Sequence, residues 1–268
     1  MSTIAASDIK KVRDFEKRYY PVKKEHDYFK IFSHFIQSSW GTYNLFKILN
    51  YTCLWPIRIA GSYFSKETIG NLHGASRKFK FISKNLLIAK YPGNFPAITR
   101  SYQAYRKAKQ SEISKARDKL ASKVAEMVAD TGFLIQLGEV LSLYSLKALG
   151  PVVNSTANLF FMLYEMFSLK ISVNNYFTND DMQKIILCGN KPSARSVSIF
   201  QEIKNADLMC LSKAVMRFAL SAFIVLDLLF QVSVLSAGPM LFLSTCSTVL
   251  AIWVYFYKES MTYPQLNK

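Results

Sequence analysis

The last part of the chain is a long apolar region with few interruptions. Residues 218–257 contain one charged side chain, Asp227, and the pair Gly238 and Pro239 divides them near the middle. Residues 240–257 are uncharged and have about the 18 residues that a tilted helix needs to cross a bilayer. Aromatic side chains gather at the end of this segment, as they do where hydrocarbon meets lipid headgroups: Trp253, Tyr255 and Tyr257. The pattern predicts a membrane-spanning helix; the alternative is a buried helix in a large soluble core.

The segment before this helix carries its charge at the centre. Asp227 lies midway along 218–236, where a carboxylate costs about 3 kcal/mol unless it faces protein or water. The segment is therefore half-buried, or it is the first arm of a hairpin whose second arm is 240–257. In both cases we expect a C-terminal membrane region over 214–258, followed by a short tail at 259–268.

A second, weaker apolar region lies in the middle of the chain. Residues 133–146 contain only Glu139 as a charged residue, and residues 148–169 contain only Glu165. Each piece is marginal in length, so the segment 131–170 predicts one crossing with a turn near Gly150 and Pro151, the first membrane region. The chain then becomes polar, and we expect residues 171–213 to form an exposed connecting loop.

The first 130 residues have the pattern of amphipathic helices. Residues 1–30 form a polar N-terminal extension, and apolar residues then recur at three- and four-residue spacing over 29–55, interrupted at Gly41 and ending near Pro56. Basic helical patterns continue to residue 130. The sequence therefore predicts an all-α integral membrane protein with amphipathic N-terminal helices and about two transmembrane helices, in which 31–130 is a basic cytosolic region.

Residues 66–90 have the clearest two-sided pattern in this region. On a helical wheel, apolar residues fall on one side: Ile69, Leu72, Ala75, Phe79, Ile82 and Leu86. Basic residues fall on the opposite side: Lys66, Arg77, Lys80 and Lys84. Such a helix is suited to lie in the bilayer interface, with its basic side on lipid phosphates and its apolar side among acyl chains. Insertion into one leaflet favours curvature; the alternative is a soluble bundle helix with a solvated basic side.

Charge separates the two halves of the chain. Residues 1–130 hold 24 Lys and Arg against 10 Asp and Glu, a net charge of +14, whereas residues 131–268 hold 10 against 8, a net charge of +2. A basic segment ahead of apolar helices favours a cytosol-facing region held against an anionic phospholipid membrane. The apolar second half, and the lack of a finger, zipper or RNA-binding signature, argue against nucleic acid. The four widely spaced cysteines predict reduced thiols, and the charged first thirty residues, without an apolar core, lead us to expect no cleavable secretory signal.

No catalytic pattern accompanies these helices. The three histidines, His26, His34 and His73, have no partners at metal-ligand spacing, and isolated glycines form no phosphate-binding loop. Asp180 and Asp181 are adjacent acids in a polar segment, where a solvated pair or a helix start is expected. The sequence therefore predicts no enzyme, no metal site and no cofactor.

Several short segments, taken in order, resemble the peroxin-11 family of peroxisome proliferation proteins. Residues 45–51 look like the family's Leu-Leu-Gln-Tyr region, and residues 76–81, Ser-Arg-Lys-Phe-Lys-Phe, look like its Gly-Arg-Lys-Leu stretch. Residues 223–227, then Gly238-Pro239, then 244–252 look like its last segment. The match covers roughly residues 40–258 and depends on the order of the segments.

This resemblance implies a multi-pass protein of the peroxisomal or glycosomal membrane, with both termini in the cytosol. The helix at 66–90 would insert into the cytosolic leaflet and elongate the organelle before fission. The implied partners are further copies of the chain in a homo-oligomer, and the organelle fission machinery, a dynamin-related GTPase and its membrane adaptor. Two alternatives stay open. One is a channel or transporter subunit for small metabolites, with Glu139, Glu165 and Asp227 lining a path. The other is a bacterial protein inserted into a host membrane, with 218–257 as a hairpin.

Overall fold

The computed structural model describes residues 6–19, 21, 28–147, 149–187, 193–231 and 236–263. Over these residues the fold is all-α, as predicted. The first helices in chain order are α1 Ala6–Glu16, α2 Tyr28–Gln37, α3 Ser39–Ala60, the 3-10 turn η1 Gly61–Tyr63, and α4 Lys66–Lys90. They are followed by η2 Tyr91–Gly93, α5 Asn94–Lys107, α6 Ile113–Val140, α7 Leu149–Leu187, α8 Ala194–Phe230 and α9 Ala237–Ser260.

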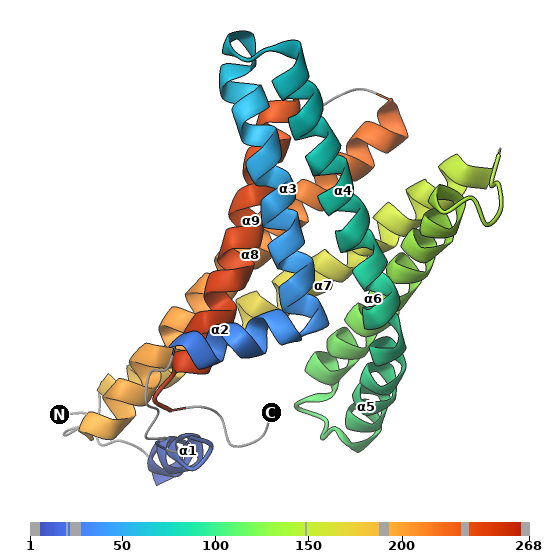
Figure 1. The fold of residues 1–268 in the computed structure, drawn as a ribbon. Helices are drawn as coiled ribbons and strands as arrows, with labels where there is room; N and C mark the ends of the chain where they lie inside the picture. Colours follow the sequence, from blue (N-terminus) through green and yellow to red (C-terminus); the bar gives the residue numbers. More distant parts are fainter. Residues whose placement is uncertain are drawn as a thin grey trace.

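The helices are arranged as successive hairpins (Figure 1). α3 and α4 pack along each other, as do α6 with α7, α7 with α8, and α8 with α9. α9 also lies beside α3, so the C-terminal helix connects the N-terminal hairpin to α8. The small helix α1 packs on the end of α7 and the start of α8, in a buried cluster of Phe15, Ile186, Ile199, Phe200 and Ile203.

A sharp break separates α2 from α3. The Ser38 hydroxyl accepts a hydrogen bond from the Gly41 amide at 2.9 Å and so caps the first turn of α3. A Cβ atom on Gly41 would lie 1.8 Å from the carbonyl oxygen of Phe35, so only glycine allows this close approach. The predicted interruption at Gly41 is therefore a corner between two helices.

The expected end of this helix near Pro56 is wrong, because α3 continues to Ala60. Contacts with α9 hold the last turn on both sides of the proline. The Trp55 indole Nε1 donates to Thr245 Oγ1 at 3.1 Å, and the Arg58 guanidinium lies against Gly238, with Nε 3.3 Å from the position of a Cβ. Packing on α9 outweighs the hydrogen bond that Pro56 cannot make.

The polar segment 171–213, which we expected to be a loop, is helical over its described residues: 171–187 continue α7, and 194–213 begin α8. Its polar side chains bond one another across the α7–α8 pair. Lys204 Nζ donates to Gln183 Oε1 at 2.7 Å and lies 3.6 Å from Asp180, while Asn179 donates to Asp207. Polarity in this segment therefore marks a helix–helix contact.

Two of the described helices, α8 and α9, are long and apolar enough to cross a membrane. Both lie in the C-terminal third of the chain. They follow one another and pack together, which is the hairpin that we considered for 218–257. Most of the middle region, 131–170, lies within α6 and α7, which do not have the same combination of length, hydropathy and low charge. Gly150 and Pro151 occupy the first turn of α7, where a proline is tolerated.

Candidate membrane-binding site

The two apolar helices are exposed along much of their length. Only 17% of the most apolar window of α8 and 22% of that of α9 is buried, whereas the core helix of a soluble protein is mostly buried. Large apolar side chains stand out from both helices: Leu229 (65% exposed), Phe230 (66%), Phe242 (56%) and Trp253 (61%). An apolar surface of this kind needs a nonaqueous environment, which indicates a membrane protein.

α8 and α9 run side by side as the arms of a hairpin. At the open end, the Tyr257 hydroxyl donates to the Glu202 carbonyl oxygen at 3.4 Å, and the Tyr263 amide donates to the Glu202 carboxylate at 3.0 Å. Arg217 is a cation in the apolar half of α8, and its guanidinium lies 3.4 Å from the buried carboxylate of Glu165 on α7. This ion pair offsets the charge of Arg217 in the apolar half of α8, while Asp227 is a second charged side chain in the same half.

The packing of α4 on α3 uses small and aromatic side chains. Ser76 and Ser83 are buried on the side of α4 that faces α3, and the Ser76 hydroxyl donates to Asn50 Oδ1 at 2.6 Å. We call this contact between α3 and α4 the seam. The Phe79 ring packs on Phe46, with centroids 6.1 Å apart. The two helices are antiparallel and level with each other at their middles.

The apolar side predicted for 66–90 lies mainly toward this seam. Ile69, Leu72, Ala75, Phe79 and Leu86 are half-buried, and Ile82 is 37% exposed. The seam is centred on Ser76 and Ser83, which the wheel did not mark as apolar. Among the predicted apolar residues, Phe79 contacts α3 through Phe46, and most of the surface of all six is covered in this conformation.

The basic side of α4 faces outward. Lys66, Arg77 and Lys80 are exposed, and Lys84 is half-buried. Burial, together with the neighbouring charge of Lys80, lowers the pKa of the Lys84 ammonium.

Two apolar residues outside the predicted apolar side lie on this basic side. Phe81 is 40% exposed and Ile88 is 52% exposed. They alternate with Arg77 and Lys84 at spacings of four, three and four residues, which places all four on one side of the helix. We call these residues, Arg77, Phe81, Lys84 and Ile88, the basic-apolar row.

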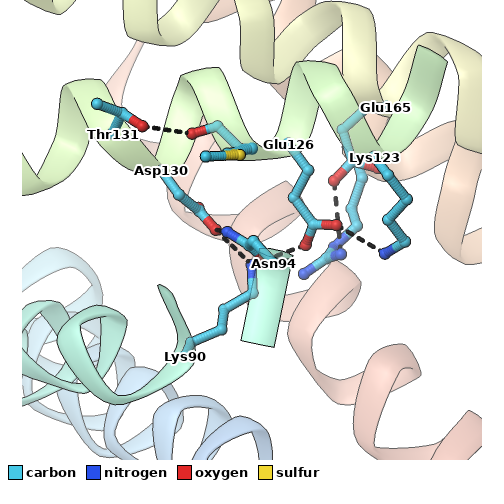
Figure 2. A network of polar contacts seen from close by, with 9 residues as sticks. Lys90, Asn94, Lys123, Glu126, Asp130, Thr131 and Glu165 are labelled. Carbon is cyan, nitrogen blue, oxygen red and sulfur yellow. Dashed lines mark hydrogen bonds and ion pairs between the residues drawn. The ribbon is translucent and has the colours of Figure 1, made fainter. Parts of the chain in front are cut away.

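The C-terminal end of α4 is anchored to α6 by a polar network (Figure 2). Lys90 Nζ lies 2.8 Å from Glu126 and 3.0 Å from Asp130, and Asn94 donates to Asp130 at 2.9 Å. The two carboxylates outweigh burial and raise the pKa of Lys90. Burial alone would raise the pKa of Glu126, but Lys90 and Lys123 lower it. Sequence reasoning missed this network, since its members are 36 to 40 residues apart.

The other residues considered for chemistry are not brought together. The Glu139 carboxylate accepts a hydrogen bond from the Leu146 amide at 3.0 Å, and Glu165 pairs with Arg217. His34 and His73 are exposed, and His26 lies outside the described residues. Within the described part of the chain, no group of His, Cys, Asp and Glu could hold a metal ion.

Comparisons with protein-family models, with curated proteins and with solved structures gave no significant match to this chain.

Proposed function

We propose that this chain is a membrane-shaping protein, held in the bilayer by the α8–α9 hairpin, that applies α4 to the cytosolic leaflet. Its action elongates and proliferates peroxisomes or related organelles before fission. The assignment to peroxisomes is based on the resemblance of short segments to the peroxin-11 family. The membrane location is supported by the exposed apolar surface of α8 and α9.

The observation that carries the proposed mechanism is the basic-apolar row. Arg77 and Lys84 can bind lipid phosphates, while Phe81 and Ile88 enter the acyl region from the same side of α4. Arg77, Phe81 and Ile88 are exposed and Lys84 is half-buried while α4 remains packed on α3. Membrane binding by this side therefore needs no unfolding of the hairpin, and the residues that join α4 to α3 keep their contacts.

The α3–α4 hairpin and α9 must separate for this function. Trp40, in the first turn of α3, packs on Tyr255 with ring centroids 5.8 Å apart, and the Trp55 indole donates to Thr245 further along α9. Since α4 packs along α3, it lies alongside α9, at the level of the membrane that α9 would span. Exposed cations at that depth would each cost about 3 kcal/mol in hydrocarbon. We infer that the hairpin swings from α9 onto the leaflet about its base, at the break near Ser38 and at η2.

Substitution of Phe81 tests this function in the full chain. Reconstituted into vesicles that contain anionic phospholipid, the protein should draw tubules visible by electron cryomicroscopy. Phe81→Asp should reduce tubules at least severalfold, because a carboxylate on the row is repelled by anionic lipid and cannot enter the acyl region.

The matched control is Phe177→Asp, which makes the same change at a side chain that is 61% exposed on α7. It should leave tubulation unchanged. Equal loss in both variants, or full tubulation by Phe81→Asp, would contradict the role of the row. Absence of tubules from the unmodified chain would overturn the membrane-shaping function itself.

A further inference from the structure

A polar pocket lies near the base of the α8–α9 hairpin, away from α4. Its volume is about 290 Å³. The turn after α1, the first turn of α6, the last third of α7, the first half of α8 and the end of α9 all contribute to its wall. The polar side chains that line it are Arg18, Tyr19, Lys115, Asn175, Thr178, Asn179, Asp207 and Lys258.

Three cations converge on this pocket from three different elements: Arg18, Lys115 and Lys258. Among the described residues, no carboxylate forms an ion pair with any of them within 4.0 Å. Asp207 is the one acid in the wall, and it interacts with Lys115 and Lys258 over a longer distance while accepting a hydrogen bond from Asn179. The wall thus carries three positive charges against one negative charge.

Neutral donors complete the pocket. The Tyr19 ring is fixed by Phe15, with centroids 5.2 Å apart, and its backbone carbonyl accepts a hydrogen bond from Arg195 at 3.1 Å. A tyrosine at its ordinary pKa of 10.0 is protonated at neutral pH, and burial and the charge of Asp207 raise the pKa of Tyr19 further, so its hydroxyl can donate. Asn175 adds an amide, whereas the Thr178 hydroxyl donates to the Asn174 carbonyl oxygen at 2.7 Å and can only accept. Cations and protonated donors around one space match the oxygens of a phosphate group.

The position of the pocket relates it to the membrane. Lys258 follows the aromatic residues at the end of α9, so with α9 in the bilayer the pocket opens at the level of the lipid headgroups. The end of α9 lies near α1 in Figure 1. The position of the pocket at the headgroups depends on the proposed function only in that α9 must lie in the membrane.

We propose that this pocket binds a phosphate group, presented by the headgroup of an anionic phospholipid. The bound headgroup would join α1, α6 and α9. It would thereby fix the base of the α8–α9 hairpin at the surface of the cytosolic leaflet. The ligand chemistry is shared by free phosphate, and the two sources are separated by experiment.

The test uses the full chain in nanodiscs of phosphatidylcholine that contain a small fraction of phosphatidic acid. Native mass spectrometry should show one phosphatidic acid retained after the other lipids are removed. The double variant Lys115→Gln/Lys258→Gln should lower retention by at least about tenfold, because two charged hydrogen-bond donors are lost. The control Arg117→Gln/Lys119→Gln removes the same charge from exposed positions of α6 outside the pocket, and should retain the lipid.

Each outcome decides the assignment. Equal retention in the double variant and the control, with unchanged helical content by circular dichroism, overturns it. Loss of the lipid on addition of millimolar inorganic phosphate, with phosphate itself detected on the pocket by ³¹P NMR, assigns a soluble ligand instead. Tubulation is read in parallel. Tubules without lipid retention refute the pocket alone, and retention without tubules refutes the proposed function alone.

Discussion

At the scale of single residues, the contacts at the end of α4 decide how the hairpin is held. Lys90 lies between two buried carboxylates, and its partners Glu126 and Asp130 project from successive turns of α6 (Figure 2). Removing one partner of such a group leaves the other buried without its counter-charge. The packing of the end of α4 on α6 therefore depends on a few charged side chains that no local sequence pattern marks.

Neutralising Glu126 should weaken this anchor. We expect Glu126→Gln to lower the free energy of unfolding by about 1–3 kcal/mol, because Lys90 keeps Asp130 as its second partner. The measurement is thermal unfolding in detergent followed by circular dichroism. The control is Glu112→Gln, at an exposed position just before α6, and equal melting temperatures in the two variants would contradict a structural role for the network.

The same carboxylate predicts a pH dependence. The pKa of Glu126 is lower in the folded chain than its ordinary value of 4.5, so its ion pairs add stability that is complete above that pH and is lost as the pH falls through the lowered folded value. The melting temperature of the unmodified protein should fall more steeply from about pH 5 to about pH 3 than that of Glu126→Gln. Parallel curves would show that the network makes no contribution.

At the scale of the helices, the sequence predicted the elements better than their contacts. The helix at 66–90 and the apolar C-terminal helices were predicted, because charge and hydrophobic periodicity are local properties. The side of α4 that faces α3 was not, since a wheel contains no information on the partner, and a seam built on Ser76 and Ser83 looks polar. Residues 171–213 were interpreted as a loop because their polar side chains suggested exposure to solvent. In the structure, several of these side chains pair with each other between α7 and α8.

The seam can be tested separately from the row. Ser76→Ala leaves the buried Asn50 Oδ1 without its hydrogen bond, which should cost about 1–3 kcal/mol. Amide hydrogen exchange should accelerate over 66–90 and stay unchanged in α9. Ser62→Ala, at an exposed position in η1, serves as the control; uniform acceleration over all helices, or none, would contradict a hairpin that is held by its own seam.

At the scale of the whole molecule, two surfaces with different requirements lie on one bundle. α8 and α9 expose apolar side chains that need hydrocarbon, while α4 exposes cations that need water or lipid phosphates. In Figure 1, α3 packs on α9 at one side and on α4 at the other. The cations of α4 therefore lie alongside the apolar helix α9, at the level that α9 would take in the membrane. Both requirements are met once the α3–α4 hairpin leaves α9 and lies along the membrane surface. The sequence predicted both surfaces but not their relative position, which depends on contacts between distant segments.

The separation of the hairpin from α9 is the central claim, and a distance between their ends tests it most directly. Tyr63 and Phe242 are exposed near the tips of the α3–α4 hairpin and of α9, at 88% and 56% exposure. Spin labels on cysteines at these positions, in a chain without its other cysteines, report their separation by pulsed electron spin resonance. In detergent the distance should match the bundle, and in anionic vesicles it should increase by tens of ångströms, about the length of α4. An unchanged distance in vesicles that the same protein has tubulated would contradict the account.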